Sequence, residues 1–235
     1  MKTLFIALFS LAALSMQAQT ADEVIQKHTA ALGGLDAFNA ITTCKITGTV
    51  TAQDNDLPVT TQIVNGKSMR TDVDVMGQSI TNVYNNGTGW KINPFAGIET
   101  PTDVTGKELV DFKGQAFLAS NLIDYKSRGH QIELLTPEEI DGITALKIKL
   151  TAKEDGRVTT YYINSATYLV HKSVTKRDLQ GMEMDVETYF ADYKDINGLK
   201  FSMSRSQKVQ GQVFQELHIE KIELNVAIDE NIFKQ

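Results

Sequence analysis

Residues 65–75 read NGKSMRTDVDV, and this stretch decides the fold. Asn65-Gly66 offers the positive φ angles that a tight hairpin turn requires. From Met69 to Val75, side chains that are apolar or threonine then alternate with charged ones. A period of two is typical of a β-strand with one apolar and one polar face. We therefore expect an antiparallel strand that begins at a hairpin turn.

The same pattern extends along most of the chain. Alternation returns at Leu146–Leu150 and at Met182–Phe190, among residues rich in Thr, Val, Ile and Tyr. Further dipeptides typical of two-residue hairpin turns separate the segments, at Asn86-Gly87, Asp141-Gly142, Asp155-Gly156 and Asn197-Gly198. The sequence therefore predicts a large antiparallel meander whose sheet has one apolar and one wet face.

Helical spacing of apolar residues occurs in only a few places. Thr20 can cap a helix that Gly33-Gly34 ends, and a short second helix is expected at Leu35–Ile41. Thr105–Ser120 carries Leu109, Phe112 and Ala116 on one stripe. A broad one-sided sheet must cover its apolar face, and these helices are the only cover that the sequence offers.

The overall composition excludes several classes of protein. The chain has 235 residues, with 23 Lys and Arg against 29 Asp and Glu, and a formal net charge of −6. This acidic balance argues against nucleic-acid binding, which needs clustered basic residues. One cysteine, Cys44, excludes an internal disulfide. The four histidines lack the spacing of zinc ligands, so no metal site is expected.

The N-terminus has the layout of a secretory signal peptide. Lys2 precedes an apolar run, Leu4–Met16, that is too short to span a bilayer, and small and polar residues follow it. We expect cleavage after Ala18 or Gln19, with a retained anchor or a buried helix as the alternative. No cysteine follows the run, so no lipid anchor is expected. Residues 20–235 then form a single soluble domain in the periplasm.

No catalytic motif survives inspection. Ser173-Val174-Thr175-Lys176 fits S-x-x-K, but it lies in a strand pattern and lacks its companion motifs. The acids at Asp72 and Asp74 begin like a calcium loop, yet the closing Glu is missing and the strand alternation explains them better. We therefore expect neither an enzyme nor a cofactor, although catalytic groups that converge from distant strands would escape this test.

Several stretches together resemble the outer-membrane lipoprotein-sorting protein family in its broad, LolA-like sense, as found in exported proteins of Bacteroidetes. They are residues 21–28 with 31–34, the segment Asn85–Phe95 with its Gly-Trp-x-Ile-Asn-Pro motif, residues 139–150, residues 161–170, and the C-terminal stretches 193–201 and 228–233. The resemblance implies a mainly β fold with some α-helix, a half-open antiparallel β-barrel closed by a helical lid. It also implies that Arg70 is the strand arginine that helps to hold the lid, with an exposed charge on the polar strand face as the alternative.

Large apolar residues are numerous enough to line an apolar cavity under such a lid. An ordinary core is the alternative on composition alone. The candidate cavity residues are Met69, Trp90, Phe95, Leu109, Phe112, Ala116, Phe117, Phe190 and Phe201.

Three functions follow from these expectations. The first is a periplasmic carrier or chaperone that binds the acyl chains of lipoproteins or lipids, because the family's best-known members carry such chains. The second is an envelope-stress sensor of the same fold that regulates a membrane partner, and the third is an exported enzyme. The expected partners are an acylated lipoprotein or lipid, with an inner- or outer-membrane protein left open, and the protein is expected to be a monomer.

Overall fold

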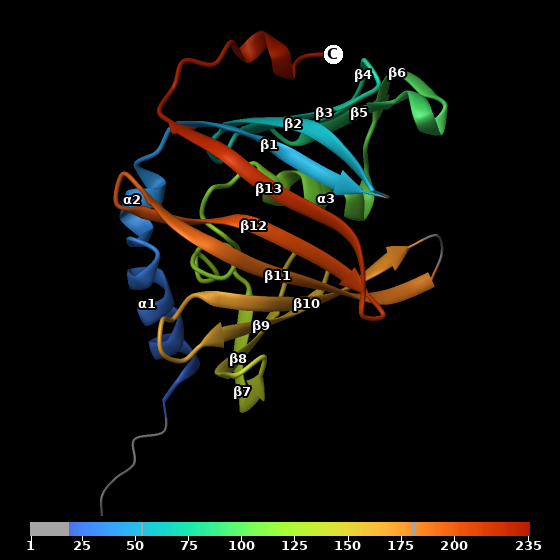
Figure 1. Ribbon diagram of the computed structural model, residues 1–235. Helices are drawn as coiled ribbons and strands as arrows, with labels where there is room; N and C mark the ends of the chain where they lie inside the picture. The colour runs from blue at the N-terminus through green and yellow to red at the C-terminus, as the bar shows by residue number, and fades with distance from the viewer. Residues whose placement is uncertain (1–18, 53, 180–181) are drawn as a thin grey trace, which may run out of the picture.

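The computed structural model describes residues 19–52, 54–179 and 182–235, which build one antiparallel sheet with helices on its concave side (Figure 1). The expected signal peptide, residues 1–19, lies outside the described residues except for Gln19. The strands are β1 Thr43–Ala52, β2 Asn55–Val64, β3 Ser68–Val75, β4 Gln78–Asn85, β5 Thr88–Asn93, β6 Ile98–Asp103, β7 Gln131–Ile140, β8 Ile143–Thr151, β9 Val158–Asn164, β10 Val170–Leu179, β11 Met182–Ile196, β12 Leu199–Val209 and β13 Gln212–Leu224.

The strand order is β6-β5-β4-β3-β2-β1-β13-β12-β11-β10-β9-β8-β7. Each strand pairs with its neighbours in sequence, except that β6 does not pair with β7, and β13 returns to pair with β1. Within the described residues the outermost strands, β6 and β7, do not pair with each other, so the curved sheet stays open. The expected fold class, a half-open antiparallel barrel with few helices, is confirmed.

Hairpin turns form at most of the predicted dipeptides. Asn86 and Gly87 have φ angles of 47° and 101°, and Asn197 and Gly198 have 55° and 84°, as two-residue turns with positive φ require.

Two dipeptides differ. Asn65-Gly66 is part of the three-residue connection 65–67, where Gly66 has a φ of 76° and Asn65 has no positive φ. Asp155-Gly156 lies inside the longer loop 152–157 between β8 and β9.

Helices α1 (Ala21–Ala31) and α2 (Leu35–Asn39) lie along one end of the strands (Figure 1). The predicted cap is present: Thr20 and Glu23 exchange hydrogen bonds in a capping box. Val24 and Ile25 pack against apolar side chains of β8 and β9, such as Ile148. The chain can turn after α1 only with glycine, because a Cβ on Gly33 would lie 2.2 Å from the Gly198 carbonyl oxygen.

Helix α3 (Gly106–Gln115) lies against β3, β4 and β5. It is shorter than the expected helical segment, Thr105–Ser120. Its predicted stripe faces the sheet, where Phe112 and Ala116 are buried beside Met69. The approach is close: a Cβ on Gly89 of β5 would lie 2.9 Å from Leu109 Cδ1. The glycine therefore permits α3 to pack on the strands.

The C-terminal segment covers the opposite, convex face of the same strands (Figure 1). Its short 3-10 helix η2, Glu230–Phe233, places Phe233 between Val83 and Trp90, where it is 1% exposed. The indole N–H of Trp90 donates to the Phe233 carbonyl oxygen at 3.2 Å. The expectation of one apolar and one wet face is therefore wrong for β4 and β5, which bury side chains on both faces.

No helix among the described residues is long and apolar enough to cross a membrane. Cys44 is buried under α3, and burial raises the pKa of its thiol to about 12. The thiol is thus protonated at neutral pH and unreactive, as expected for a structural cysteine.

Buried histidine makes the fold sensitive to mild acid. His28 is 2% exposed, and its Nδ1 lies 2.7 Å from the Tyr168 carbonyl oxygen. Desolvation lowers its pKa, and the hydrogen bond to Tyr168 offsets this only in part. The unfolded chain takes up a proton near pH ~6.5 whereas the folded chain resists it, so stability is full above that pH and falls below it.

We therefore expect a lower melting temperature at pH 5.5 than at pH 7.5 in scanning calorimetry. His130, whose pKa burial also lowers, adds to this difference. His28→Gln, which keeps an N–H donor for the Tyr168 carbonyl oxygen, should reduce the difference in melting temperature between the two pH values. An unchanged difference in His28→Gln would show that His28 does not contribute.

Candidate ligand-binding cavity

The concave side of the sheet is covered unequally. Helix α3 fills the half over β3–β5 with the cluster around Phe112 and Met69. The half over β8–β12 is left with a cavity of about 350 Å³ between the strands and α3. This volume lies within the range of known small-molecule sites.

Alternate residues of neighbouring strands line this cavity, as the two-residue period of a strand dictates. They are Thr159 and Tyr161 on β9, Ser173, Thr175 and Arg177 on β10, Val186, Thr188 and Phe190 on β11, and Arg205 and Gln207 on β12, facing Val110, Asp111 and Gly114 of α3. The sequence predicts an apolar cavity, whereas the observed lining is both polar and apolar. Burial raises the pKa of Tyr161 to about 12, so its hydroxyl stays neutral.

Three arginines lie in the cavity, in two different electrostatic settings. Arg157 contacts both Asp111 of α3 and Asp155, whose Oδ2 lies 2.9 Å from its Nη2. Arg205 lies over the Phe190 ring, with its Cζ 5.7 Å from the ring centroid. Its guanidinium keeps contact with solvent in the cavity, yet the protein around it desolvates the cation and lowers the pKa of Arg205. It remains protonated.

A charged hollow of about 620 Å³ adjoins the cavity and shares Asp111, Asp155, Arg157 and Arg177 with it. It lies at the N-terminal end of α3, beside Lys107. The cavity therefore opens toward solvent through a mouth lined with charges of both signs.

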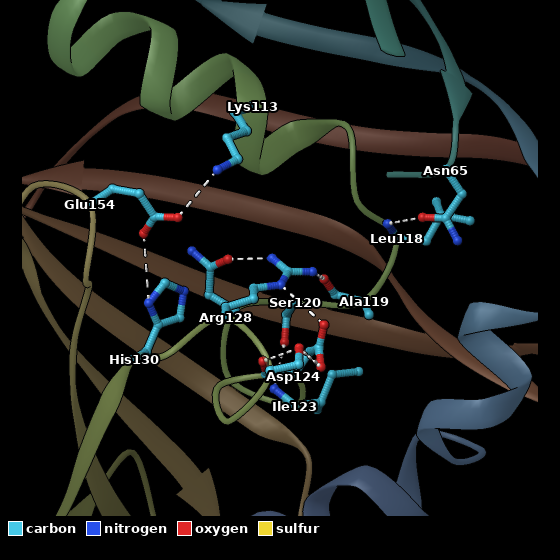
Figure 2. A network of polar contacts seen from close by, with 12 residues as sticks. Asn65, Lys113, Leu118, Ala119, Ser120, Ile123, Asp124, Arg128, His130 and Glu154 are labelled. Carbon is cyan, nitrogen blue, oxygen red and sulfur yellow. Dashed lines mark hydrogen bonds and ion pairs between the residues drawn. The ribbon is translucent and has the colours of Figure 1, made fainter. Parts of the chain in front are cut away.

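A polar network fixes the chain that follows α3 (Figure 2). Arg128 donates to the Ala119 carbonyl oxygen at 2.7 Å and to Asn121, and its Cζ lies 4.3 Å from the Phe117 ring centroid. Asn65 Oδ1 accepts from the Leu118 N–H at 3.1 Å. The loop is thus tied both to itself and to the turn before β3.

The network continues from α3 to the loop between β8 and β9. Lys113 Nζ lies 3.4 Å from Glu154, whose other carboxylate oxygen lies 3.7 Å from His130 Nδ1 (Figure 2). Sequence reasoning missed these residues, because the partners are far apart in the chain and no local pattern joins them.

The structure places the candidate cavity residues in four different locations. Met69, Leu109, Phe112 and Ala116 meet in the cluster under α3, with Phe117 and Phe201 packed against it. Phe190 is the member that lines the cavity over β8–β12. Trp90 lies on the convex face with Phe233, and Phe95 is 55% exposed between β5 and β6.

Arg70 contacts the C-terminal segment instead of α3. It points to the convex face because Met69, its neighbour on β3, points to the concave one. Its guanidinium forms two hydrogen bonds with Asp72, at 2.8 and 2.9 Å, and donates to the Ile232 carbonyl oxygen at 2.9 Å. Asp72 also accepts from Thr81 at 2.7 Å. The resemblance implied a contact between Arg70 and the lid, whereas Arg70 joins β3 to the C-terminal segment on the convex face of the sheet.

Exposed apolar side chains gather at one end of the barrel. Each lies at or near a connection at the end of β3, β5, β8, β10 or β12, and the antiparallel order places these connections at the same end. They are Met76, Phe95, Val158, Met182, Val213 and Phe214.

Comparison with known proteins supports the fold. No protein-family model matches the sequence, and no curated protein matches it. A LolA superfamily protein from Nitrosomonas europaea has a similar structure, with a TM-score of 0.63 and 13% identity, over 93% of this chain and 99% of that one. A putative outer membrane lipoprotein-sorting protein domain from Vibrio parahaemolyticus gives a TM-score of 0.58 and 13% identity, over 92% and 96%.

A DUF1329 family protein from Desulfovibrio piger is also similar, with a TM-score of 0.53 and 11% identity, over 92% of this chain and 98% of that one. Sequence identities this low support a similarity of fold and nothing more. The likeness read from the sequence is confirmed at that level: the chain has the half-open barrel fold of LolA superfamily structures.

Proposed function

We propose that the protein is an exported binding protein that shields an acyl chain of a lipoprotein or lipid between α3 and the concave face of the sheet. The observation that carries this proposal is the cavity of about 350 Å³ that α3 leaves over β8–β12. The similar structures include a putative lipoprotein-sorting domain, and the apolar N-terminal run of the sequence fits export to the periplasm.

An acyl chain has a physical reason to enter this space. Each CH₂ group that leaves water contributes about 0.8 kcal/mol, so a long chain favours any groove that can bury it. Phe190 offers apolar surface in the cavity, and the buried side chains of Val186 and Leu150 lie beneath it. Next to the cavity, the apolar cluster around Met69 is covered by α3 and by Phe117 and Leu118, which follow this helix.

Helix α3 can therefore act as a lid that competes with the ligand. Its ion pairs with the rest of the protein are the partly buried pair of Asp111 with Arg157 and two more exposed ones among the described residues. The exposed ones are Lys91 with Glu108 at 2.7 Å and Lys113 with Glu154 at 3.4 Å. Exposed pairs of this kind each contribute about 0–1 kcal/mol. The apolar contacts of Leu109 and Phe112 hold α3 in place, and a chain that replaces them offsets the cost of opening.

A titration with the apolar dye N-phenyl-1-naphthylamine, followed by displacement with decanoate, tests the proposal. We expect the protein without residues 1–19 to bind the dye and to release it to decanoate. Gly114 faces the cavity from α3, and a Cβ there meets no atom within 4 Å, so Gly114→Phe should fill the space and abolish binding. Gln115→Phe adds the same ring to an exposed position of α3 and should bind normally.

Circular dichroism on both variants serves as the folding control. The proposal fails if the wild-type protein takes up neither the dye nor decanoate. It also fails if a folded Gly114→Phe protein binds both as well as the Gln115→Phe protein does.

A further inference from the structure

The arginines of this protein divide into two groups by their partners. The chain has five, and three of them hold carboxylates: Arg70 with Asp72, Arg128 with Asp124, and Arg157 with Asp111 and Asp155. Among the described side chains, Arg177 and Arg205 form no ion pair. Both line the cavity over β8–β12. The cavity thus holds two cations without a matching negative charge.

The strand register fixes where these cations lie. Arg205 on β12 is the direct cross-strand partner of Phe190 on β11, and its guanidinium lies over that ring. Arg177 lies near the end of β10 and lines both the cavity and its mouth. One cation therefore lies beside an aromatic ring of the cavity, and the other lies at the entrance.

The groups around the two cations do not neutralise them. Thr175 and Thr159 hydrogen-bond to each other through their hydroxyls, and Tyr161 is neutral. The two carboxylates of the cavity lining, Asp111 and Asp155, are both engaged by Arg157.

At the mouth, where Arg177 lies, Glu183 pairs with Lys176 and Glu108 pairs with Lys91. Arg177 and Arg205 are both exposed, so their guanidinium groups are solvated and available to an anion. A ligand chain that excludes water from the cavity would strengthen that contact.

We propose that Arg205 and Arg177 bind the anionic head group of a single-chain lipid, a carboxylate or a phosphate, while its chain lies on Phe190 and the apolar surface under α3. The planar fork of a guanidinium fits both kinds of oxyanion with two parallel hydrogen bonds. This inference rests on the proposed function and narrows its ligand to an anionic amphiphile.

Displacement of N-phenyl-1-naphthylamine by three ligands of equal chain length tests the inference: decanoate, decyl phosphate and the uncharged decanol. We expect both anions to bind the wild-type protein about tenfold or more tightly than decanol, the gain typical of a charge-assisted hydrogen bond. If one anion binds more tightly than the other, the comparison identifies which head group, carboxylate or phosphate, the two arginines bind.

Arg205→Gln and Arg177→Gln should reduce that preference and leave decanol binding within about twofold, because the apolar surface is intact. Lys200→Gln, an exposed position on the same strand as Arg205, removes the same charge outside the cavity and should change nothing. Equal affinity for decanol and decanoate in the wild type, or an undiminished preference in Arg205→Gln, would overturn the anion site and leave the proposed function standing. Absence of binding by all three ligands would overturn both.

Discussion

Replacing Phe112 by aspartate is expected to lower the free energy of unfolding by more than about 3 kcal/mol, because truncation of a buried Phe alone costs about 3–5 kcal/mol and the new carboxylate lacks a partner. Phe112 is 6% exposed in the cluster with Met69 and Ala116. Urea unfolding followed by circular dichroism measures the change. The cluster of α1 with β7–β10 has separate side chains, so β signal should persist without urea.

Lys107→Asp provides the matched control, because it places the same carboxylate on an exposed position of α3. It should change stability by no more than about 0.5 kcal/mol. If the midpoint of urea unfolding is the same for Phe112→Asp as for the wild-type protein, α3 does not pack on the sheet as described and apolar contacts do not hold the lid.

The second large effect concerns the C-terminal segment. Phe233→Ala is expected to cost about 3–5 kcal/mol, since Phe233 is 1% exposed between Val83 and Trp90. Trp90 is the only tryptophan, so its fluorescence reports directly on this contact. Emission should shift to longer wavelength as water reaches the indole.

Phe95→Ala makes the same truncation at a ring that is 55% exposed, and it should cost less than about 0.5 kcal/mol. Equal losses in Phe233→Ala and Phe95→Ala, with unchanged Trp90 emission, would mean that the C-terminal segment does not seal the convex face.

Much of the fold could be predicted from the sequence because strand alternation and turn residues are local signals. Met69 and Arg70 do point to opposite faces, and Asn86-Gly87 and Asn197-Gly198 do form turns. Alternation does not say what covers each face. The convex side of β4 and β5 was expected to be wet, but Phe233, distant in the sequence, packs on it.

The site was harder to predict than the fold. Most of the large apolar residues that the sequence offers as cavity candidates form the core under α3, the alternative that composition alone also allows. The cavity is marked instead by polar residues at alternate positions of a concave face, such as Ser173, Thr175 and Arg177 on β10. The sequence shows which residues share a strand face, but which of the two faces lies toward α3 depends on the direction in which the sheet curves.

Photolabelling tests the central claim most directly, that the ligand lies between α3 and the inward face of β8–β12. A fatty acid with a diazirine near its chain end would be bound to the protein without residues 1–19, and the complex would be irradiated. Mass spectrometry would then map the labelled peptides. We expect label on α3 and on inward residues of β9–β12, competed by decanoate and lost in Gly114→Phe. Another hollow, of about 470 Å³, lies between α1 and the loop after α3 and is lined by Ile25, Leu35 and Ile123. Label confined to this hollow, or to the exposed turns around Met76, Phe95 and Phe214, would contradict the account.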